Sequence, residues 1–235
     1  MKEMLTNRIL SDLPDAEFAR LMPLLEPVSL SAGGRINGAG DKARFVYFPE
    51  SAVLSCHAEM QDGKSTEIAL IGRDGVTGLA SLLGGSRPSP HTLGVTVAGS
   101  ALRVRKDDFE RELRAGEGLL RALLSYVGDY VTQVSQRAAC AVLHRMEQRL
   151  AVWLLLLTDR LESGAVELTQ ERIANHLGVR RAGVTEVAGE LQRRGVISYT
   201  RGSLRVVNRE ALEEVACECY AAMAGARRQR QSTYH

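Results

Sequence analysis

The sequence has 235 residues, of which 45% are hydrophobic and 25% charged, and its formal net charge is +2. These values are typical of a globular chain with one large or two modest domains, and an anionic partner must be met by a local basic patch. The N-terminus has no apolar signal segment, and the longest apolar run, residues 151–157, is far too short to cross a bilayer. We therefore expect a cytoplasmic protein that makes no membrane contact.

The first 30 residues show helical spacing of apolar residues, with Ser11 or Asp12 as the candidate N-cap. From residue 31 to about residue 105, glycines recur between short apolar runs. The Asp62-Gly63 pair between two of these runs is a strong hairpin signal. Many short strands at regular spacing predict a closed or rolled antiparallel sheet.

A long helix follows, with an apolar stripe that advances by alternating steps of four and three residues. Such a heptad stripe favours a partner helix, and the simplest partner is the same helix of a second subunit. Packing on its own domain is the alternative. The predicted dimer-interface residues are Leu120, Leu124, Val127, Val131, Val134 and Ala138. A further helix is expected from residue 143 to residue 161, with one apolar side that carries Leu143, Met146, Leu150, Trp153, Leu154 and Leu157.

The stretch LTQERIANHLGVRRAGVTEVAGELQRRGVI, residues 168–197, contains two short helical patterns separated by Gly178. Two helices joined by a tight turn need a small residue at their packing point, here Ala174, and a turn residue free to adopt positive φ. Val184 and Val187 fall where the second helix must dock. Thr169 stands at the N-cap position of the first helix. The spacing predicts a helix-turn-helix.

The outward face of the second helix combines an arginine, a carboxylate and small residues. An arginine can bond guanine bidentately, a carboxylate can accept from cytosine, and small residues permit close approach to base edges. The residues before each helix are expected to contact phosphates, as is the tip of a strand–turn–strand wing at residues 195–208. The predicted DNA contacts are Thr169, Gln170, Arg180, Arg181, Ala182, Thr185, Glu186 and Arg201. A solvated helix pair is the alternative, but the full order of helix, turn, helix and hairpin favours double-stranded DNA.

With the segment FVYFPESAV in the sheet region, this order of elements resembles the Crp–Fnr family of transcription regulators, named after the catabolite activator and the fumarate-nitrate reduction regulator. The resemblance implies an α+β fold. It implies a cyclic-nucleotide-binding-like β-roll at 1–116, a dimerisation helix at 117–143 and a winged helix-turn-helix at 144–225. A basic tail, 226–235, is expected to be flexible. It also implies a homodimer that regulates transcription from a two-fold symmetric operator.

The recognition segment departs from the family pattern Arg-Glu-Thr-Val-x-Arg, because this chain has RAGVTE at 181–186. Arg181 matches the first arginine of that pattern. Ala182 replaces the usual glutamate and Glu186 the usual second arginine. We therefore expect a half-site that differs from the family's common one, with Arg181 reading a guanine and Glu186 helping to select a cytosine-bearing pair.

Family members that bind cyclic mononucleotides use Gly-Glu followed by Arg-Ser-Ala, where the glutamate holds the ribose and the arginine the phosphate. Here Leu79 follows Gly78, and residues 89–91, Ser-Pro-His, stand near the second motif. Cyclic AMP is therefore not expected as an effector. The remaining ligand candidates are Gly78, Arg87 and His91, and a cyclic dinucleotide stays possible for the sensor, as does the absence of any small-molecule effector.

The sequence predicts no metal site. No cysteine precedes Cys56, which argues against an iron–sulfur cluster in the N-terminal region. Cys217 and Cys219 are too closely spaced for a zinc site of four ligands, and on a helix they would point to different faces. His57 beside Cys56 and His144 near Cys140 are interpreted as structural.

Three further interpretations belong to other classes of protein. The β-roll would serve as a protein-interaction module, for example for RNA polymerase, in a regulator that needs no effector. An enzyme is not expected, because no metalloprotease, serine-hydrolase or P-loop motif occurs. A cyclic-nucleotide-binding subunit without DNA function is disfavoured by the helix-turn-helix and by the altered cassette.

Overall fold

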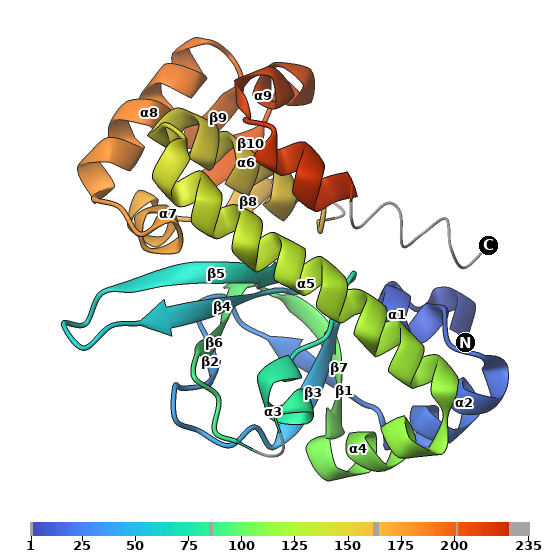
Figure 1. Ribbon diagram of the computed structural model, residues 1–235. Coiled ribbons are helices and arrows are strands. Elements are labelled where there is room, and N and C mark those ends of the chain that lie inside the picture. The colour runs from blue at the N-terminus through green and yellow to red at the C-terminus, as the bar shows by residue number, and fades with distance from the viewer. Residues whose placement is uncertain (1, 85–86, 162–164, 201, 226–235) are drawn as a thin grey trace.

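The computed structural model describes residues 2–84, 87–161, 165–200 and 202–225. It has the α+β fold expected from the sequence: a β-roll, a long helix that crosses it, and a smaller domain of helices and short strands packed around the C-terminal half of that helix (Figure 1). Arg201 and the basic tail lie outside the described residues.

The N-terminal segment is helical only in part. Ser11 and Asp12 were expected to cap the helix that follows them, but that helix begins at Asp15 and its N-cap residue is Pro14, which makes no side-chain cap hydrogen bond. Asn7 caps a separate short helix that Ser11 ends, and its side chain accepts a hydrogen bond from the Leu10 amide. Residues 26–30 pair with a later strand of the roll and leave the expected helical region. The elements are η1 (Lys2–Met4), α1 (Arg8–Ser11), α2 (Asp15–Leu21), η2 (Met22–Leu24) and β1 (Glu26–Leu30).

The β-roll consists of two antiparallel sheets, with strand orders β1-β7-β3 and β2-β6-β4-β5. The Asp62-Gly63 pair lies in the turn between β4 and β5, and Gly63 has a φ of 82° there. This hairpin is therefore confirmed. The remaining strands of the roll are β2 (Arg35–Asn37), β3 (Phe45–Pro49), β4 (Val53–Glu59), β5 (Ser65–Ile71), β6 (Thr92–Val97) and β7 (Gly99–Arg105).

The long helix is α5 (Glu117–Leu143), which follows α3 (Leu79–Leu83) and α4 (Lys106–Ala115). Its N-terminal half contributes Leu119, Leu123 and Tyr126 to the core that fills one side of the roll. The C-terminal half lies along β5 of the roll and contributes Cys140 to the core of the smaller domain, so α5 joins the two parts of the molecule (Figure 1).

The helix α6 (Met146–Thr158) is buried on every side, not on the one side that was expected. All residues from Leu150 to Leu157 are at most 3% exposed. The physical reason is that α6 packs on α8 and α9 while its core also takes in Val53 and Leu70 of the roll. A helix enclosed by several elements is apolar all round. Leu143, expected on α6, ends α5 and is exposed.

The C-terminal domain carries the winged helix-turn-helix. Its sheet has the order β8-β10-β9, so the expected wing hairpin gains a third strand that the sequence analysis did not anticipate. The elements are β8 (Ala165–Glu167), α7 (Gln170–Leu177), α8 (Arg181–Arg193), β9 (Ile197–Thr200), β10 (Ser203–Val206) and α9 (Arg209–Val215).

Candidate nucleic-acid interface

The turn between α7 and α8 is built as the sequence predicts. Thr169 caps α7, since its Oγ1 accepts a hydrogen bond from the Arg172 amide at 3.2 Å. Gly178 has a φ of 65°, in the left-handed region that favours glycine. Ala174 is buried at the helix packing point. These local features orient α8 relative to α7.

The buried side of α8 consists of Val184, Ala188 and Leu191, and half-buried Val187 packs on the same core. Docking this side leaves the opposite side in solvent. The exposed residues there are Arg181, Ala182, Thr185, Glu186 and Gly189. The helix therefore presents the face that was expected from its periodicity.

Residues from both helices meet at this face. Thr185 Oγ1 donates a hydrogen bond to Gln170 Oε1 at 2.6 Å, which holds the start of α7 beside α8. Arg180 is exposed at the N-cap position of α8. Within the described part of the chain, no carboxylate forms an ion pair with Arg180 or Arg181, whereas Arg194 is paired with Glu147 at 2.7 Å.

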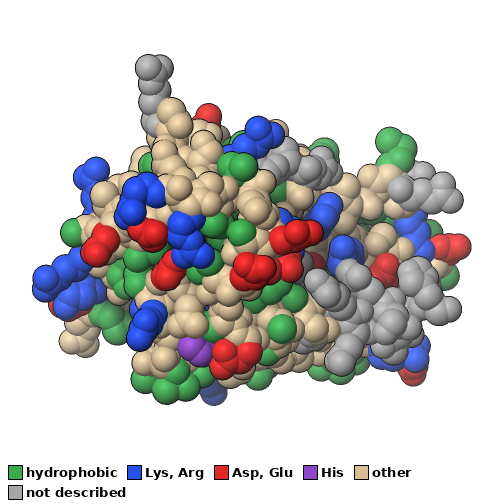
Figure 2. Space-filling model, turned by 90° about the horizontal axis from the view of Figure 1, so that it is seen from above, with side chains coloured by type: hydrophobic (Ala, Val, Ile, Leu, Met, Phe, Trp, Pro, Cys, Tyr) green, Lys and Arg blue, Asp and Glu red, His purple; other side chains and the backbone are tan. Residues whose placement is uncertain are grey.

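Lys and Arg side chains gather at the left-hand end of the molecule in Figure 2, the end at which Figure 1 places α7 and α8. Acidic side chains lie among them. The basic character of the surface is therefore local, as the small net charge of +2 requires.

The predicted dimer stripe divides into two parts. Leu120, Leu124 and Val131 are 39%, 52% and 58% exposed, and Ala138 is also exposed. The other two stripe residues, Val127 and Val134, are half-buried and line a cavity beneath α5. The exposed part forms an apolar face on a long helix.

That cavity, of about 460 Å³, lies between α5 and the β-roll. Gly78 and His91 line it, whereas Arg87 is exposed and does not. Among the described residues, no lysine, arginine or carboxylate lines the cavity. Burial lowers the pKa of His91, so its imidazole is neutral at neutral pH.

A buried carboxylate connects the C-terminal domain to the roll. Glu67 of β5 accepts from Arg137 Nη1 at 2.7 Å and from Trp153 Nε1 at 2.9 Å, and its second oxygen lies 2.7 Å from His176 Nδ1. We call Glu67, Arg137, Trp153 and His176 the docking cluster. It joins β5, α5, α6 and α7. No local pattern in the sequence indicates this cluster, because the partners lie 70 or more residues from Glu67 along the chain.

Burial by itself raises the pKa of Glu67, but the charges of Arg137 and His176 outweigh it and lower the pKa to about 2. The carboxylate therefore stays ionised at neutral pH. Burial also lowers the pKa of the neighbouring His57.

The first helix of the helix-turn-helix lies directly against the roll. Arg172 donates to the carbonyls of Val95 and Thr96, each at 3.1 Å. A Cβ at position 178 would lie 2.8 Å from Thr66 Oγ1, so glycine is required there both for its φ and for close approach. The orientation of α8 is thus set by contacts with the roll.

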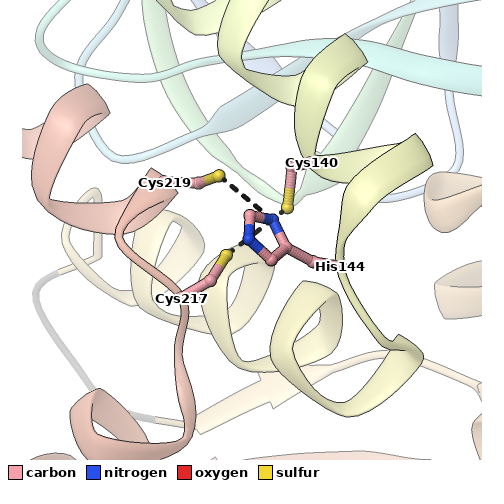
Figure 3. A group of neighbouring side chains, drawn as sticks. All are labelled: Cys140, His144, Cys217 and Cys219. Atoms are coloured by element: carbon pink, nitrogen blue, oxygen red, sulfur yellow. Dashed lines mark hydrogen bonds between the residues drawn. The ribbon is translucent and has the colours of Figure 1, made fainter.

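The prediction that Cys217 and Cys219 would point to different faces of a helix is wrong. Cys217 lies outside any helix, between α9 and the helical segment that begins at Cys219, so the two side chains are not held on opposite faces of one helix. Instead, both point toward Cys140 and His144 (Figure 3). Four atoms capable of binding a metal ion lie within 4.8 Å of one another.

Two sequence models match the chain. The Crp-like helix-turn-helix domain matches residues 148–215, and the cyclic nucleotide-binding domain matches residues 27–115. Together they span more than half of the chain, in the order that the fold shows. The chain belongs to the Crp/Fnr family. It is a DNA-binding transcription regulator of the Crp/Fnr type.

Relatives share this organisation. The chain is 25% identical over 184 residues to the global nitrogen regulator of Synechocystis sp., which covers 74% of this chain and 81% of that protein. FixK2 from Bradyrhizobium japonicum is 17% identical with a TM-score of 0.70, over 82% of this chain and 98% of that one. The c-di-GMP responsive regulator CLP from Xanthomonas campestris is 14% identical with a TM-score of 0.67, over 82% and 99%. The two solved structures support the fold alone.

Across the residues that the structure describes, none of the helices combines the length and the apolar character needed to span a membrane.

We expect Glu67→Gln to lower the free energy of unfolding at pH 7 by about 3 kcal/mol, because Arg137 is left without its buried partner. The folded pKa of about 2 lies below the ordinary value of 4.5, so this stabilisation is present above pH 4.5 and is lost as the pH falls toward 2. Denaturant unfolding at several pH values measures both effects.

The matched control is Glu59→Gln, on the exposed end of β4 in the same hairpin, which should change stability by less than about 0.5 kcal/mol. Equal losses in the two variants, or a difference from wild type that stays constant down to pH 3, would contradict the assignment.

Proposed function

We propose that this regulator binds a two-fold symmetric operator as a homodimer and inserts α8 of each subunit into the major groove. The observation that carries the proposal is the exposed face of α8, where Arg181, Thr185 and Glu186 flank the small residues Ala182 and Gly189. A helix with this composition can approach base edges closely. Two identical helices related by a two-fold axis would read half-sites about one helical turn apart.

Within each half-site we assign different roles to different residues. Arg181 reads a guanine through a bidentate contact, and Glu186 accepts from a cytosine of a neighbouring pair. Thr169, Gln170 and Arg180 contact phosphates, which position α8 without reading sequence. The hydrogen bond between Thr185 and Gln170 supports this arrangement, because it joins the phosphate-contacting end of α7 to the reading face. Arg201 is assigned to a phosphate beside the wing.

The dimer is proposed to form through α5. This helix separates the proposed β-roll domain at 1–116 from the proposed DNA-binding domain at 144–225. The exposed apolar residues Leu120, Leu124 and Val131, together with Ala138, favour a second copy of α5 as their partner. Val127 and Val134 border both this face and the cavity. A ligand bound in the cavity would therefore change the packing of residues at the proposed dimer interface.

The sensor is proposed not to respond to cyclic AMP. A cyclic mononucleotide carries a phosphate, and the cavity that contains Gly78 and His91 has no cationic side chain among its described lining residues. Two alternatives remain. A cyclic dinucleotide would also need a cation, which Arg87 would have to supply by moving. A regulator that needs no effector would use the β-roll to contact another protein, such as RNA polymerase.

Arg181→Ala is expected to remove about 1–3 kcal/mol of discrimination in each half-site, because the guanine contact is lost. Sites selected by the wild-type protein from random duplexes, near physiological salt, provide the probe, and competition against scrambled duplex measures the preference. Arg111→Ala, which alters an exposed arginine of α4, is the matched control and should keep the full preference. An Arg181→Ala protein with undiminished preference would refute the assigned role.

Leu124→Glu should raise the dimer dissociation constant by about 100-fold or more, since two leucines lose their apolar burial and two charges enter the interface. Sedimentation velocity over a range of protein concentrations measures the change. Val207→Glu, which alters a similarly exposed valine in the C-terminal domain, serves as the control and should remain dimeric. Wild-type-like dimerisation of Leu124→Glu would exclude this face of α5.

Isothermal titration calorimetry with cyclic AMP is expected to show no binding at micromolar ligand concentrations, because no lysine or arginine is found among the described residues that line the cavity to neutralise the phosphate. Micromolar or tighter affinity would overturn this part of the proposal.

A further inference from the structure

Three thiols and an imidazole meet where the long helix ends. Cys140 lies in the last turn of α5 and His144 is its C-cap residue, while Cys217 and Cys219 follow α9 (Figure 3). Cys140 Sγ lies 3.6 Å from Cys217 Sγ, and Cys219 Sγ lies 3.4 Å from His144 Nδ1. All four atoms fall within 4.8 Å of one another, and the three cysteines are buried.

Two of the six separations among these atoms are close to those of a tetrahedral zinc site, and the other four are at most 4.8 Å. With Zn–S bonds of about 2.3 Å and a Zn–N bond of about 2.0–2.1 Å, tetrahedral angles separate two sulfurs by about 3.8 Å and a sulfur from the nitrogen by about 3.5 Å. The observed 3.6 Å and 3.4 Å differ from these by only a few tenths of an ångström. Small side-chain rotations would therefore bring the four atoms around one ion.

Two neighbouring residues supply outer contacts of the kind that metal ligands use. His144 Nε2 lies 3.3 Å from Glu218 Oε1, which leaves Nδ1 directed at the thiols. Histidine ligands in metal sites commonly place their second ring nitrogen against a carboxylate in this way. Gln136 Nε2 donates to Cys219 Sγ at 3.2 Å, a hydrogen bond that would stabilise a thiolate.

We propose that Cys140, His144, Cys217 and Cys219 bind one Zn²⁺ per chain in a closed four-ligand site. Three sulfurs and one nitrogen in tetrahedral array are the ligand set and geometry that select zinc. A disulfide between Cys140 and Cys217 is the competing chemistry at this position. It would give no role to Cys219, to the inward-facing imidazole nitrogen or to Glu218.

The site connects two parts of the chain that lie 77 residues apart. On one side is the end of α5, and on the other is the segment that closes the C-terminal domain behind α9. Between them, the chain leaves α5 at His144 in an extended conformation and enters α6. A metal ion bound here would hold the C-terminal domain in one orientation relative to α5, since a cross-link across a long loop restricts the separation of its ends.

It follows, on the basis of the proposed function, that zinc favours DNA binding by the dimer. The ion would fix the position of α8 with respect to the helix that pairs the two subunits, and only a correctly spaced pair of helices reaches both half-sites. This coupling requires that the zinc-bound arrangement have the higher affinity for the operator.

Metal content tests the site without reference to DNA. The full-length protein is reduced, stripped with a chelator, loaded with ZnCl₂, desalted and analysed by elemental mass spectrometry, and we expect one zinc per chain. Loading with CoCl₂ should give the visible d–d bands of a tetrahedral cobalt thiolate. A protein that retains no zinc, or whose cysteines are recovered as a Cys140–Cys217 disulfide after purification under reducing conditions, would overturn the proposal.

Matched variants locate the ion. Cys217→Ser and Cys219→Ser should abolish zinc retention and the cobalt bands, whereas Cys56→Ser, which alters the cysteine that lines the sensor cavity, should retain one zinc per chain. Glu218→Gln keeps all four ligands and should weaken zinc affinity about 10- to 100-fold, so it tests the site even where a ligand variant fails to fold. Equal zinc retention by Cys56→Ser and Cys217→Ser would place the ion elsewhere.

DNA binding then tests the coupling. Affinity for the selected operator, measured with stripped and zinc-loaded wild type, is expected to differ at least about tenfold in favour of the loaded protein, within the usual range of such couplings. If one zinc is bound but the affinity for the operator is unchanged, the zinc site would be supported and its coupling to DNA binding would be refuted. If the protein retains zinc but neither the stripped nor the zinc-loaded protein selects an operator from random duplexes, the result would count against the proposed function and not against the zinc site.

Discussion

The burial of Glu67 between the roll and the C-terminal domain is the contact on which the arrangement of the molecule depends. An ionised carboxylate out of contact with water needs charged or polar partners close to it, and here the partners come from α5, α6 and α7 at once. Because α7 leads directly into α8, the same contact that satisfies the charge also sets the direction of the recognition helix. Arg172 and Gly178 extend this docking along α7.

The helix α5 connects the cavity in the roll to the C-terminal domain. The cavity is bordered by Val127, Tyr130 and Val134 of α5, and Arg137 of the docking cluster lies one helical turn beyond Val134. Farther along the same helix are Cys140 and His144 of the proposed zinc site. Residues of the cavity wall, the proposed dimer face, the docking cluster and the proposed zinc site therefore follow one another along α5. A small shift of α5 would change all of these contacts together, and packed interfaces respond to such shifts by switching between discrete arrangements.

The residues of the cavity and of the recognition helix support the proposal that the ligand and the operator of this protein differ from those common in its family. The described residues that line the cavity are mostly apolar and include no lysine or arginine, whereas a phosphate would need a cation. The recognition helix offers Ala182 and Glu186 where the family pattern has a glutamate and an arginine. Both departures point the same way: the architecture of the family is retained, while the ligand and the operator are proposed to differ.

The sequence by itself determined the features that depend on residues within a few turns of one another. Thr169, Gly178 and the spacing of Val184, Ala188 and Leu191 encode the helix-turn-helix locally, and the Asp62-Gly63 turn and the heptad stripe encode the hairpin and the long helix in the same way. Only the tertiary structure decided what α6 packs against, which stripe residues turn toward the cavity, and how Glu67 is paired. It also brought Cys140 and Cys217 together from positions 77 residues apart. The physical reason is that these contacts join elements distant in the chain, and nothing in local spacing states which distant faces will pack together.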